Sequence, residues 1–154
     1  MIPKKHLGQH FLRCKWVVST LIHAAELQHE DIVLEIGPGE GGLTRALAHH
    51  SGQVIAVEKD EKLAQELKGS LKKGRISNVE IIAGDILVLL STRLSLVDST
   101  HNLLPATYKL IANIPYYLTS RLLRMLLEGE QKPQLIVLVL ARRKFPAKPR
   151  LSKS

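Results

Sequence analysis

The sequence predicts an α/β fold in which a parallel β-sheet carries helices on both faces. Short apolar runs of strand length alternate along the chain with amphipathic segments of helical spacing. The strand candidates are apolar at successive positions, which indicates that both faces of the sheet are covered. A cluster of glycines directly follows the first strand candidate, as is typical of a strand-to-helix turn that approaches a ligand.

The expected elements alternate in order along the chain. Strands are predicted over residues 32–36, 54–58, 79–83, 108–112 and 135–140. Helices are predicted over residues 16–27, 43–50, 60–73 and 118–127, with residues 91–107 as a loop around a weak helix. Trp16 and Tyr117 are expected to pack. Right-handed crossovers place the carboxyl ends of all parallel strands at one edge of the sheet, where ligands bind near the point at which the strand order reverses.

Composition limits the class of protein. The 154 residues suit one domain, and 45% apolar residues are enough for a packed core. No apolar run reaches the roughly 20 residues of a membrane helix, and no signal peptide is recognisable. The single cysteine, Cys14, favours a cytoplasmic setting. The net charge of +8 suits a polyanionic partner, although six of the 22 lysines and arginines lie in residues 141–154.

Glycines and acidic residues after three strand candidates predict a nucleoside cofactor site. Gly37 and Gly39 let the backbone pass close to a ligand. Glu58 ends the second strand candidate, where a carboxylate could bind both hydroxyls of a ribose. Asp85 follows the third and could accept the exocyclic amine of an adenine. Glu35 precedes the glycines, where a carboxylate tolerates an ammonium or sulfonium ligand better than a pyrophosphate.

The segment Asn113-Ile114-Pro115-Tyr116 follows the fourth strand candidate and predicts an acceptor site for an amine. Adenine N6 is a poor nucleophile because its lone pair is delocalised into the ring. The Asn113 side-chain oxygen and the Ile114 carbonyl could grip the two amino hydrogens, while Pro115 keeps that peptide out of the helical region. Tyr116 could stack on a flipped base. Catalysis at such a site would consist mostly of positioning.

Together these motifs resemble the ribosomal RNA adenine N6-dimethyltransferases of the kasugamycin-resistance type. The matching stretches, in family order, are KKHLGQHFL (4–12), VLEIGPGEGGLTRAL (33–47), VIAVEKDEKLAQEL (54–67), IIAGDIL (81–87) and KLIANIPYYLTSRLL (109–123). The resemblance covers roughly residues 4–140. It implies the class I methyltransferase fold, which is Rossmann-like, and S-adenosyl-L-methionine as the cofactor.

The resemblance also implies roles for individual residues. The cofactor would be lined by His10, Leu12, Gly37, Glu58 and Asp85. Within that set, Glu58 would hold the ribose and Asp85 the adenine. Asn113 would lie between cofactor and target amine, and Tyr116 would stack on the target base. The family dimethylates two adjacent adenines of small-subunit rRNA in the cytoplasm, so the expected partner is that rRNA or a pre-ribosomal particle, with the chain a monomer and no metal involved.

The chain departs from the family pattern after residue 140. The family continues with a Gln-Lys-Glu-Val-like segment, further strands and a small helical domain that helps to grip RNA. Residues 141–154 instead carry two prolines and six cations without an apolar period, which is typical of disorder. A shifted reading frame would explain this, because GCC AGA AGG AAG TTT, one permitted coding of residues 141–145, gives Gln-Lys-Glu-Val when it is read from the third base.

We therefore expect an incomplete methyltransferase domain over residues 1–140, a basic tail over residues 141–154, and no C-terminal helical domain. An uncovered apolar edge at the fifth strand or a neighbouring one would leave the chain marginally stable and catalytically weak or inactive. A natural short form whose tail binds RNA is the alternative explanation.

Three other functions stay open at this point. An NAD-dependent dehydrogenase would use Gly37, Gly39, Gly42 and Glu58 as a dinucleotide fingerprint, but it leaves residues 113–116 without a role. A methyltransferase acting on another amine, such as a DNA adenine or a protein glutamine, would use the same two motifs. A non-catalytic RNA-binding factor of ribosome assembly would need only the basic surface.

Overall fold

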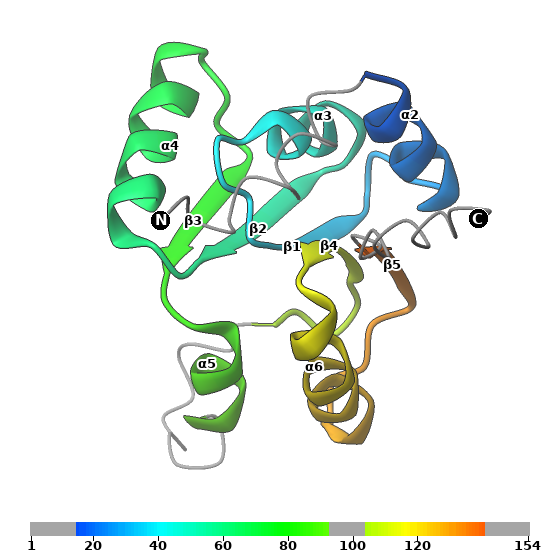
Figure 1. The fold of residues 1–154 in the computed structure, drawn as a ribbon. Coiled ribbons are helices and arrows are strands. Elements are labelled where there is room, and N and C mark those ends of the chain that lie inside the picture. The colour runs from blue at the N-terminus through cyan, green and yellow to red at the C-terminus, as the bar shows by residue number, and fades with distance from the viewer. Residues whose placement is uncertain (1–14, 93–103, 141–154) are drawn as a thin grey trace, which may run out of the picture.

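A five-stranded parallel sheet forms the centre of the computed structural model, which describes residues 15–92 and 104–140 (Figure 1). The strand order is β3–β2–β1–β4–β5. The strands are β1 (Ile32–Ile36), β2 (Gln53–Glu58), β3 (Val79–Ala83), β4 (Lys109–Ile114) and β5 (Leu135–Leu140). All four neighbouring pairs are parallel, as predicted. Residues 1–14, 93–103 and 141–154, and the expectations that fall on them, lie outside the described residues.

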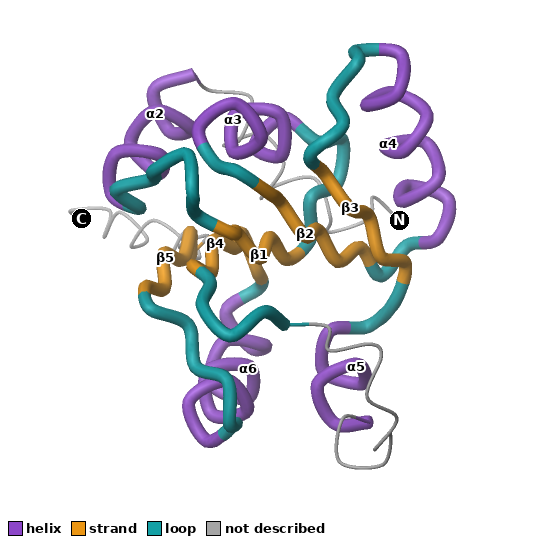
Figure 2. Tube along the Cα trace, turned by 180° about the vertical axis from the view of Figure 1, so that it is seen from behind, coloured by secondary structure: helices purple, strands orange, loops and turns teal. Residues whose placement is uncertain are grey.

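Helices cover both faces of this sheet (Figure 2). The elements on one face are α2 (Lys15–Ala24), α3 (Gly42–His50) and α4 (Glu61–Lys73), and those on the other are α5 (Ile86–Thr92) and α6 (Tyr116–Glu128). Alternate strand residues point to opposite faces, so the core divides into two clusters. Val33 and Ile111 pack with Leu47 on the first face, whereas Leu34 and Leu110 belong to the second.

The chain reverses its direction across the sheet between β1 and β4. It moves outward from β1 to β2 and β3, then returns to place β4 on the other side of β1. Ile36, at the carboxyl end of β1, lies level with Val57 of β2 and Ala112 of β4. Parallel α/β sheets bind their ligands outside such a reversal, so the loops after β1, β2 and β4 are the ones that the fold brings to a binding crevice.

Several local expectations were wrong. The first helix ends earlier than expected because Glu26 adopts a left-handed φ of 46°, and Trp16 is largely exposed rather than packed. Strand β4 continues through Asn113, which pairs with Val139 of β5. Residues 86–92 form the unpredicted helix α5. No helix in the described part of the chain is both long and apolar enough to cross a membrane.

A partly buried ion pair ties the start of β4 to the loop that precedes β1. Lys109 Nζ donates to Asp31 Oδ2 at 2.7 Å and to the Glu26 carbonyl at 2.8 Å. Burial raises the pKa of the Asp31 carboxyl, but hydrogen bonds from Lys109 and the Gln28 amide outweigh it and leave this pKa below its usual value. The charged form of Asp31 is therefore favoured in the folded protein.

Asp31→Asn is expected to lower the free energy of unfolding at pH 7 by about 1–2 kcal/mol, because a charge-assisted hydrogen bond is weakened. The folded-state pKa lies below the unfolded one, so this stabilisation is present above the unfolded pKa and is lost as pH falls through the folded value. Urea denaturation at pH 7 and about pH 3 measures it, with exposed Glu30→Gln as the control. A difference between wild type and Asp31→Asn that does not shrink in acid would contradict this account.

Candidate functional site

The glycine loop that follows β1 approaches the carboxyl end of β4. Gly37 has a φ of +71°, in the left-handed region where glycine is favoured, and its amide donates to the Val57 carbonyl at 2.9 Å. A Cβ atom at Gly37 would lie 3.7 Å from the Asn113 carbonyl oxygen. The loop therefore brings the backbone that was predicted to contact the cofactor beside the segment that was predicted to bind the acceptor.

Glu58, at the end of β2, holds two of the loops at this edge. Its buried carboxylate accepts a hydrogen bond from the Gly39 amide at 3.1 Å and another from the Asp60 amide at 2.9 Å. Its backbone carbonyl accepts from the Gly84 amide at 2.8 Å. An ionised carboxylate offers about four acceptor positions, so two remain after these side-chain bonds. Glu58 can thus order the glycine loop and still accept both hydroxyls of a ribose.

Asp85 directly precedes α5, and its surroundings favour the charged carboxylate. Its Oδ1 accepts from the Leu87 amide at 2.9 Å, which caps the helix, and its Oδ2 lies 3.0 Å from Lys59 Nζ. The hydrogen bond from Lys59, followed by that from the Leu87 amide, lowers the pKa of Asp85. A partly exposed, ionised carboxylate at this place suits the exocyclic amine of an adenine.

Glu35 is the most unusual acidic residue of the edge. Its side chain is 1% exposed, and within the described part of the chain neither carboxyl oxygen has a hydrogen-bond partner. Burial raises the pKa of Glu35 to about 8; the nearby Thr44 hydroxyl opposes the rise without forming a bond of good geometry, and the Glu58 charge adds to it. A cationic ligand would supply the missing partner, so this carboxyl suits an ammonium or sulfonium group.

The predicted acceptor segment spans the end of β4 and the start of α6. Pro115 has φ −59°, the value that its ring fixes, and ψ 140°, so its extended conformation separates strand from helix. The Tyr116 side chain is 54% exposed and that of Tyr117 is 72% exposed, with ring centroids 6.2 Å apart in an edge-to-face arrangement. The expectation that Tyr117 packs is therefore wrong, and two aromatic rings are available for stacking on a base.

Most of the predicted site residues thus meet at one edge of the sheet. A Cβ atom at Gly37 would be in van der Waals contact with the Asn113 carbonyl, and Gly39 donates a hydrogen bond to Glu58. The Gly84 amide connects Glu58 to the loop that carries Asp85. His10 and Leu12 lie outside the described residues. Within residues 15–92 and 104–140, no group of three or more His, Cys, Asp or Glu side chains could hold a metal ion.

Comparison with known proteins identifies the family of this chain. A family model described as ribosomal RNA adenine dimethylase matches residues 3–150. The chain belongs to this family. It is 44% identical over 136 residues to ribosomal RNA small subunit methyltransferase A of Dehalococcoides mccartyi, a match that covers 88% of this chain and 44% of that protein. The corresponding protein of Pelotomaculum thermopropionicum is 43% identical, with 89% and 47% covered. The chain spans less than half the length of these curated relatives.

Solved structures confirm the class I methyltransferase fold. The 23S rRNA methyltransferase ErmE aligns with a TM-score of 0.67 at 31% identity, covering 84% of this chain and 47% of that one. A dimethyladenosine transferase from Plasmodium falciparum aligns with a TM-score of 0.65 at 28% identity, covering 82% and 42%. An RNA methyltransferase from Salinibacter ruber, solved in complex with S-adenosyl-L-homocysteine, shares the fold at 21% identity and a TM-score of 0.57, covering 81% and 74%.

Two residues that support the site were missed in the sequence. Lys59 pairs with Asp85 from the neighbouring loop. Arg45 donates to the Glu40 carbonyl of the glycine loop at 2.9 Å and to the Ser70 hydroxyl of α4 at 2.6 Å, so it fixes the loop against that helix. Both are ordinary surface cations in the sequence, and only the tertiary contacts distinguish them. A spacing argument could have suggested Lys59, because it directly follows Glu58 at the same sheet edge.

Glu35→Gln is expected to remove a pH dependence of stability. The folded-state pKa of about 8 lies above the ordinary value of 4.5, so the folded wild type retains a proton that the unfolded chain releases. Its free energy of unfolding should therefore fall as pH rises from 4.5 to 8, by about 1–4 kcal/mol. A neutral amide should abolish that fall in urea denaturation series at pH 5 and pH 8.5.

Exposed Glu80→Gln is the matched control and should keep the wild-type profile. If Glu35→Gln and wild type lose stability in parallel between these two pH values, the carboxyl is not protonated in the folded protein.

Proposed function

We propose that this chain binds S-adenosyl-L-methionine and directs its methyl groups to the N6 amines of two adjacent adenines in small-subunit rRNA, during ribosome biogenesis. The observation that carries the proposal is the close approach of the glycine loop to the acceptor segment, where a Cβ atom at Gly37 would lie 3.7 Å from the Asn113 carbonyl oxygen. This approach supports a cofactor site and an amine site that lie side by side. Membership of the ribosomal RNA adenine dimethylase family supports the choice of reaction.

The cofactor would be held by residues of different chemistry. Glu58 has acceptor capacity left for the ribose hydroxyls, and the ionised Asp85 suits the adenine amine. The buried Glu35 carboxyl would face the positive charge of the methionine part, and that charge would favour its ionised form. When bound, S-adenosyl-L-methionine supplies an activated methyl group. His10 and Leu12 are proposed to complete the lining, as the resemblance implies.

The acceptor adenine would be positioned rather than chemically activated by a base. The Asn113 side-chain oxygen and the Ile114 carbonyl would each accept one N6 hydrogen, which localises the nitrogen lone pair and aims it at the methyl group. The conformation of Pro115 separates these acceptors from α6. Tyr116, with Tyr117 beside it, would stack on the flipped base. Holding both reactants in an aligned geometry accounts for most of the expected rate enhancement.

Two further points belong to the proposal. Residues 1–140 form the cofactor-binding domain and residues 141–154 a basic tail. The substrate is small-subunit rRNA or a pre-ribosomal particle in the cytoplasm, and the chain acts as a monomer. The curated relatives named ribosomal RNA small subunit methyltransferase A support the rRNA substrate.

Asn113→Ala is the variant that separates catalysis from RNA binding alone. Removing the side-chain acceptor should bring transfer of tritiated methyl groups to undermethylated small subunits down to the enzyme-free background, while retention of the same rRNA on filters changes less than about threefold. Gln134→Ala, which removes an exposed amide at the start of β5, is the control and should behave as wild type.

An Asn113→Ala protein that methylates as fast as wild type would contradict the proposed mechanism. Wild-type binding of rRNA without any methyl transfer would instead favour the assembly-factor function. Transfer to DNA or protein but not to rRNA would indicate another amine substrate.

A further inference from the structure

The end of α4 and the loop after it carry a run of cations without an acid. Lys68, Lys72, Lys73 and Arg75 lie between Glu66 and Glu80, and no acidic residue separates them. Lysines in the last turn of a helix are common, because they offset the negative end of the helix dipole. That explanation suits Lys72 and Lys73, which lie in the last turn of α4. It does not explain Arg75, which follows the helix, or why three of these cations lie along one groove.

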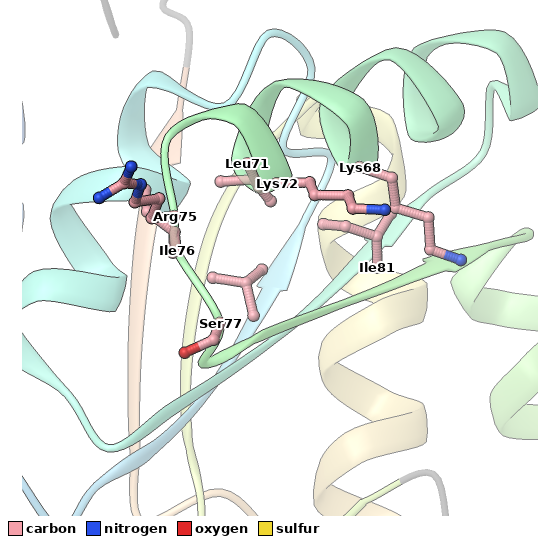
Figure 3. A pocket seen from close by; sticks show the side chains of 8 residues that line it. Lys68, Leu71, Lys72, Arg75, Ile76, Ser77 and Ile81 are labelled. Atoms are coloured by element: carbon pink, nitrogen blue, oxygen red, sulfur yellow. The ribbon is translucent and has the colours of Figure 1, made fainter.

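Three of these cations line a groove of about 460 Å³ between α4 and β3 (Figure 3). Besides Lys68, Lys72 and Arg75, its lining consists of Ser77 and the apolar side chains of Leu71, Ile76, Val79 and Ile81. Glu80 does not line the groove, since it lies between Val79 and Ile81 on a strand whose alternate side chains point to opposite faces. The volume is in the range of pockets that bind small organic ligands.

No carboxylate among the described residues pairs with the cations that line the groove. Elsewhere in these residues Lys59, Lys62 and Lys109 each pair with a carboxylate, whereas Arg121, Arg124 and Lys132 do not, so the groove is distinguished by having three such cations along one hollow. Lys68, Lys72 and Arg75 take part in no ion pair within the same ranges. Three cations that line one hollow and have no ion pair among the described residues attract a polyanion, because neutralising its phosphates releases condensed counterions.

Arg75 is held in a backbone conformation that favours glycine. Its φ is +56°, and the Ile76 amide closes the helix by donating to the Leu71 carbonyl at 3.0 Å, a motif that usually has glycine at this position. The neighbouring Gly74 has an ordinary φ of −78°. The chain therefore keeps a large cation where glycine would cost less, directly at the groove, and strain of this kind is often retained for function.

We propose that this groove binds the phosphate backbone of the substrate RNA at a second contact point, outside the acceptor site. The proposal rests on the proposed function, because it takes RNA to be the substrate. Strand β3 is separated from β4 by β2 and β1, about 15 Å across the sheet at the usual strand spacing. The groove is also lined by the end of α4 and by the amino-terminal part of β3, whereas the acceptor segment follows the carboxyl end of β4, so the two places differ in position along the strands as well. The groove therefore contributes affinity and orientation for a long RNA and takes no part in the methyl transfer.

Arg45 links the helix that carries two of the groove cations to the glycine loop of the candidate site. Its guanidinium donates to the Ser70 hydroxyl, between Lys68 and Lys72 in the sequence of α4, and to the Glu40 carbonyl.

The test compares two double variants with the same loss of charge. Lys68→Gln/Lys72→Gln removes two groove cations, and Lys62→Gln/Lys132→Gln removes two exposed cations elsewhere. Dissociation constants for a small-subunit rRNA fragment are measured across a salt series. The groove variant should bind 5- to 30-fold more weakly, and the slope of log K against log salt should fall by about 1–2. The control should change less than twofold, and both variants should keep wild-type affinity for S-adenosyl-L-homocysteine.

Arg75→Gly gives a second readout that a purely structural role would not produce. Glycine relieves the left-handed strain, so the melting temperature should rise while RNA affinity falls two- to fivefold. Wild-type RNA affinity in the groove variants, or equal losses in both double variants, would overturn the groove proposal and leave the proposed function intact. Failure of the wild-type chain to bind RNA at all would overturn both.

Discussion

The arrangement of the candidate site depends on one buried carboxylate, that of Glu58. Its two oxygens hold the glycine loop at Gly39 and the start of α4 at Asp60, and its carbonyl holds Gly84 in the loop before α5. Loops that diverge from three strands are thereby fixed at one edge of the sheet. Burial strengthens these bonds because water competes little for the carboxylate, and the parallel register of β1, β2 and β3 sets where that carboxylate lies.

The acidic residues of this edge differ in protonation because their surroundings differ. Glu35 has no hydrogen-bond donor among the described residues, and burial raises its pKa to about 8, which favours the protonated, uncharged carboxyl at pH 7. Asp85 is kept ionised by Lys59 and the Leu87 amide. The ionised Asp85 suits an amine donor, and a cation beside Glu35 would supply its missing partner and favour its ionised form, so this edge suits a ligand with a cation at one end and an amine donor at the other. Such a ligand is chemically unlike a dinucleotide, whose pyrophosphate would lie against the acids beside the glycine loop, so the dehydrogenase alternative explains this edge poorly.

Much of the fold follows from apolar patterning. The first and last residues of β1, β3 and β5 were predicted correctly, because a short, mostly apolar run between polar residues leaves little choice of where the strand begins and ends. Helix α5 was missed because ILVLL, residues 86–90, is a continuous apolar run without helical period, and Asp85 was considered as a ligand rather than as a helix cap. Asn113 was expected after β4, but pairing with β5 keeps it inside the strand.

The residues of the candidate site could be predicted from the sequence, but their exposure and their interactions could not. Residue types at strand ends identified the acids and the acceptor segment. The exposure of Tyr117, the Lys59–Asp85 pair and the absence of a partner for Glu35 within residues 15–92 and 104–140 depend on tertiary packing, which the sequence does not encode locally. The same holds for the groove beside α4, since the cations are visible in the sequence but their pairing is not.

A methyl-donor site at this sheet edge is tested most directly by locating where S-adenosyl-L-homocysteine binds, since this is what S-adenosyl-L-methionine becomes when it loses its methyl group. Nitrogen-15 chemical shifts of the chain would be followed during titration with S-adenosyl-L-homocysteine. Saturable shifts are expected in the loops after β1, β2, β3 and β4, at the amides of Gly37, Gly39, Glu58, Asp85 and Asn113. Saturable binding that leaves these amides unmoved, or no binding at millimolar ligand, would contradict a methyl-donor site at this edge of the sheet.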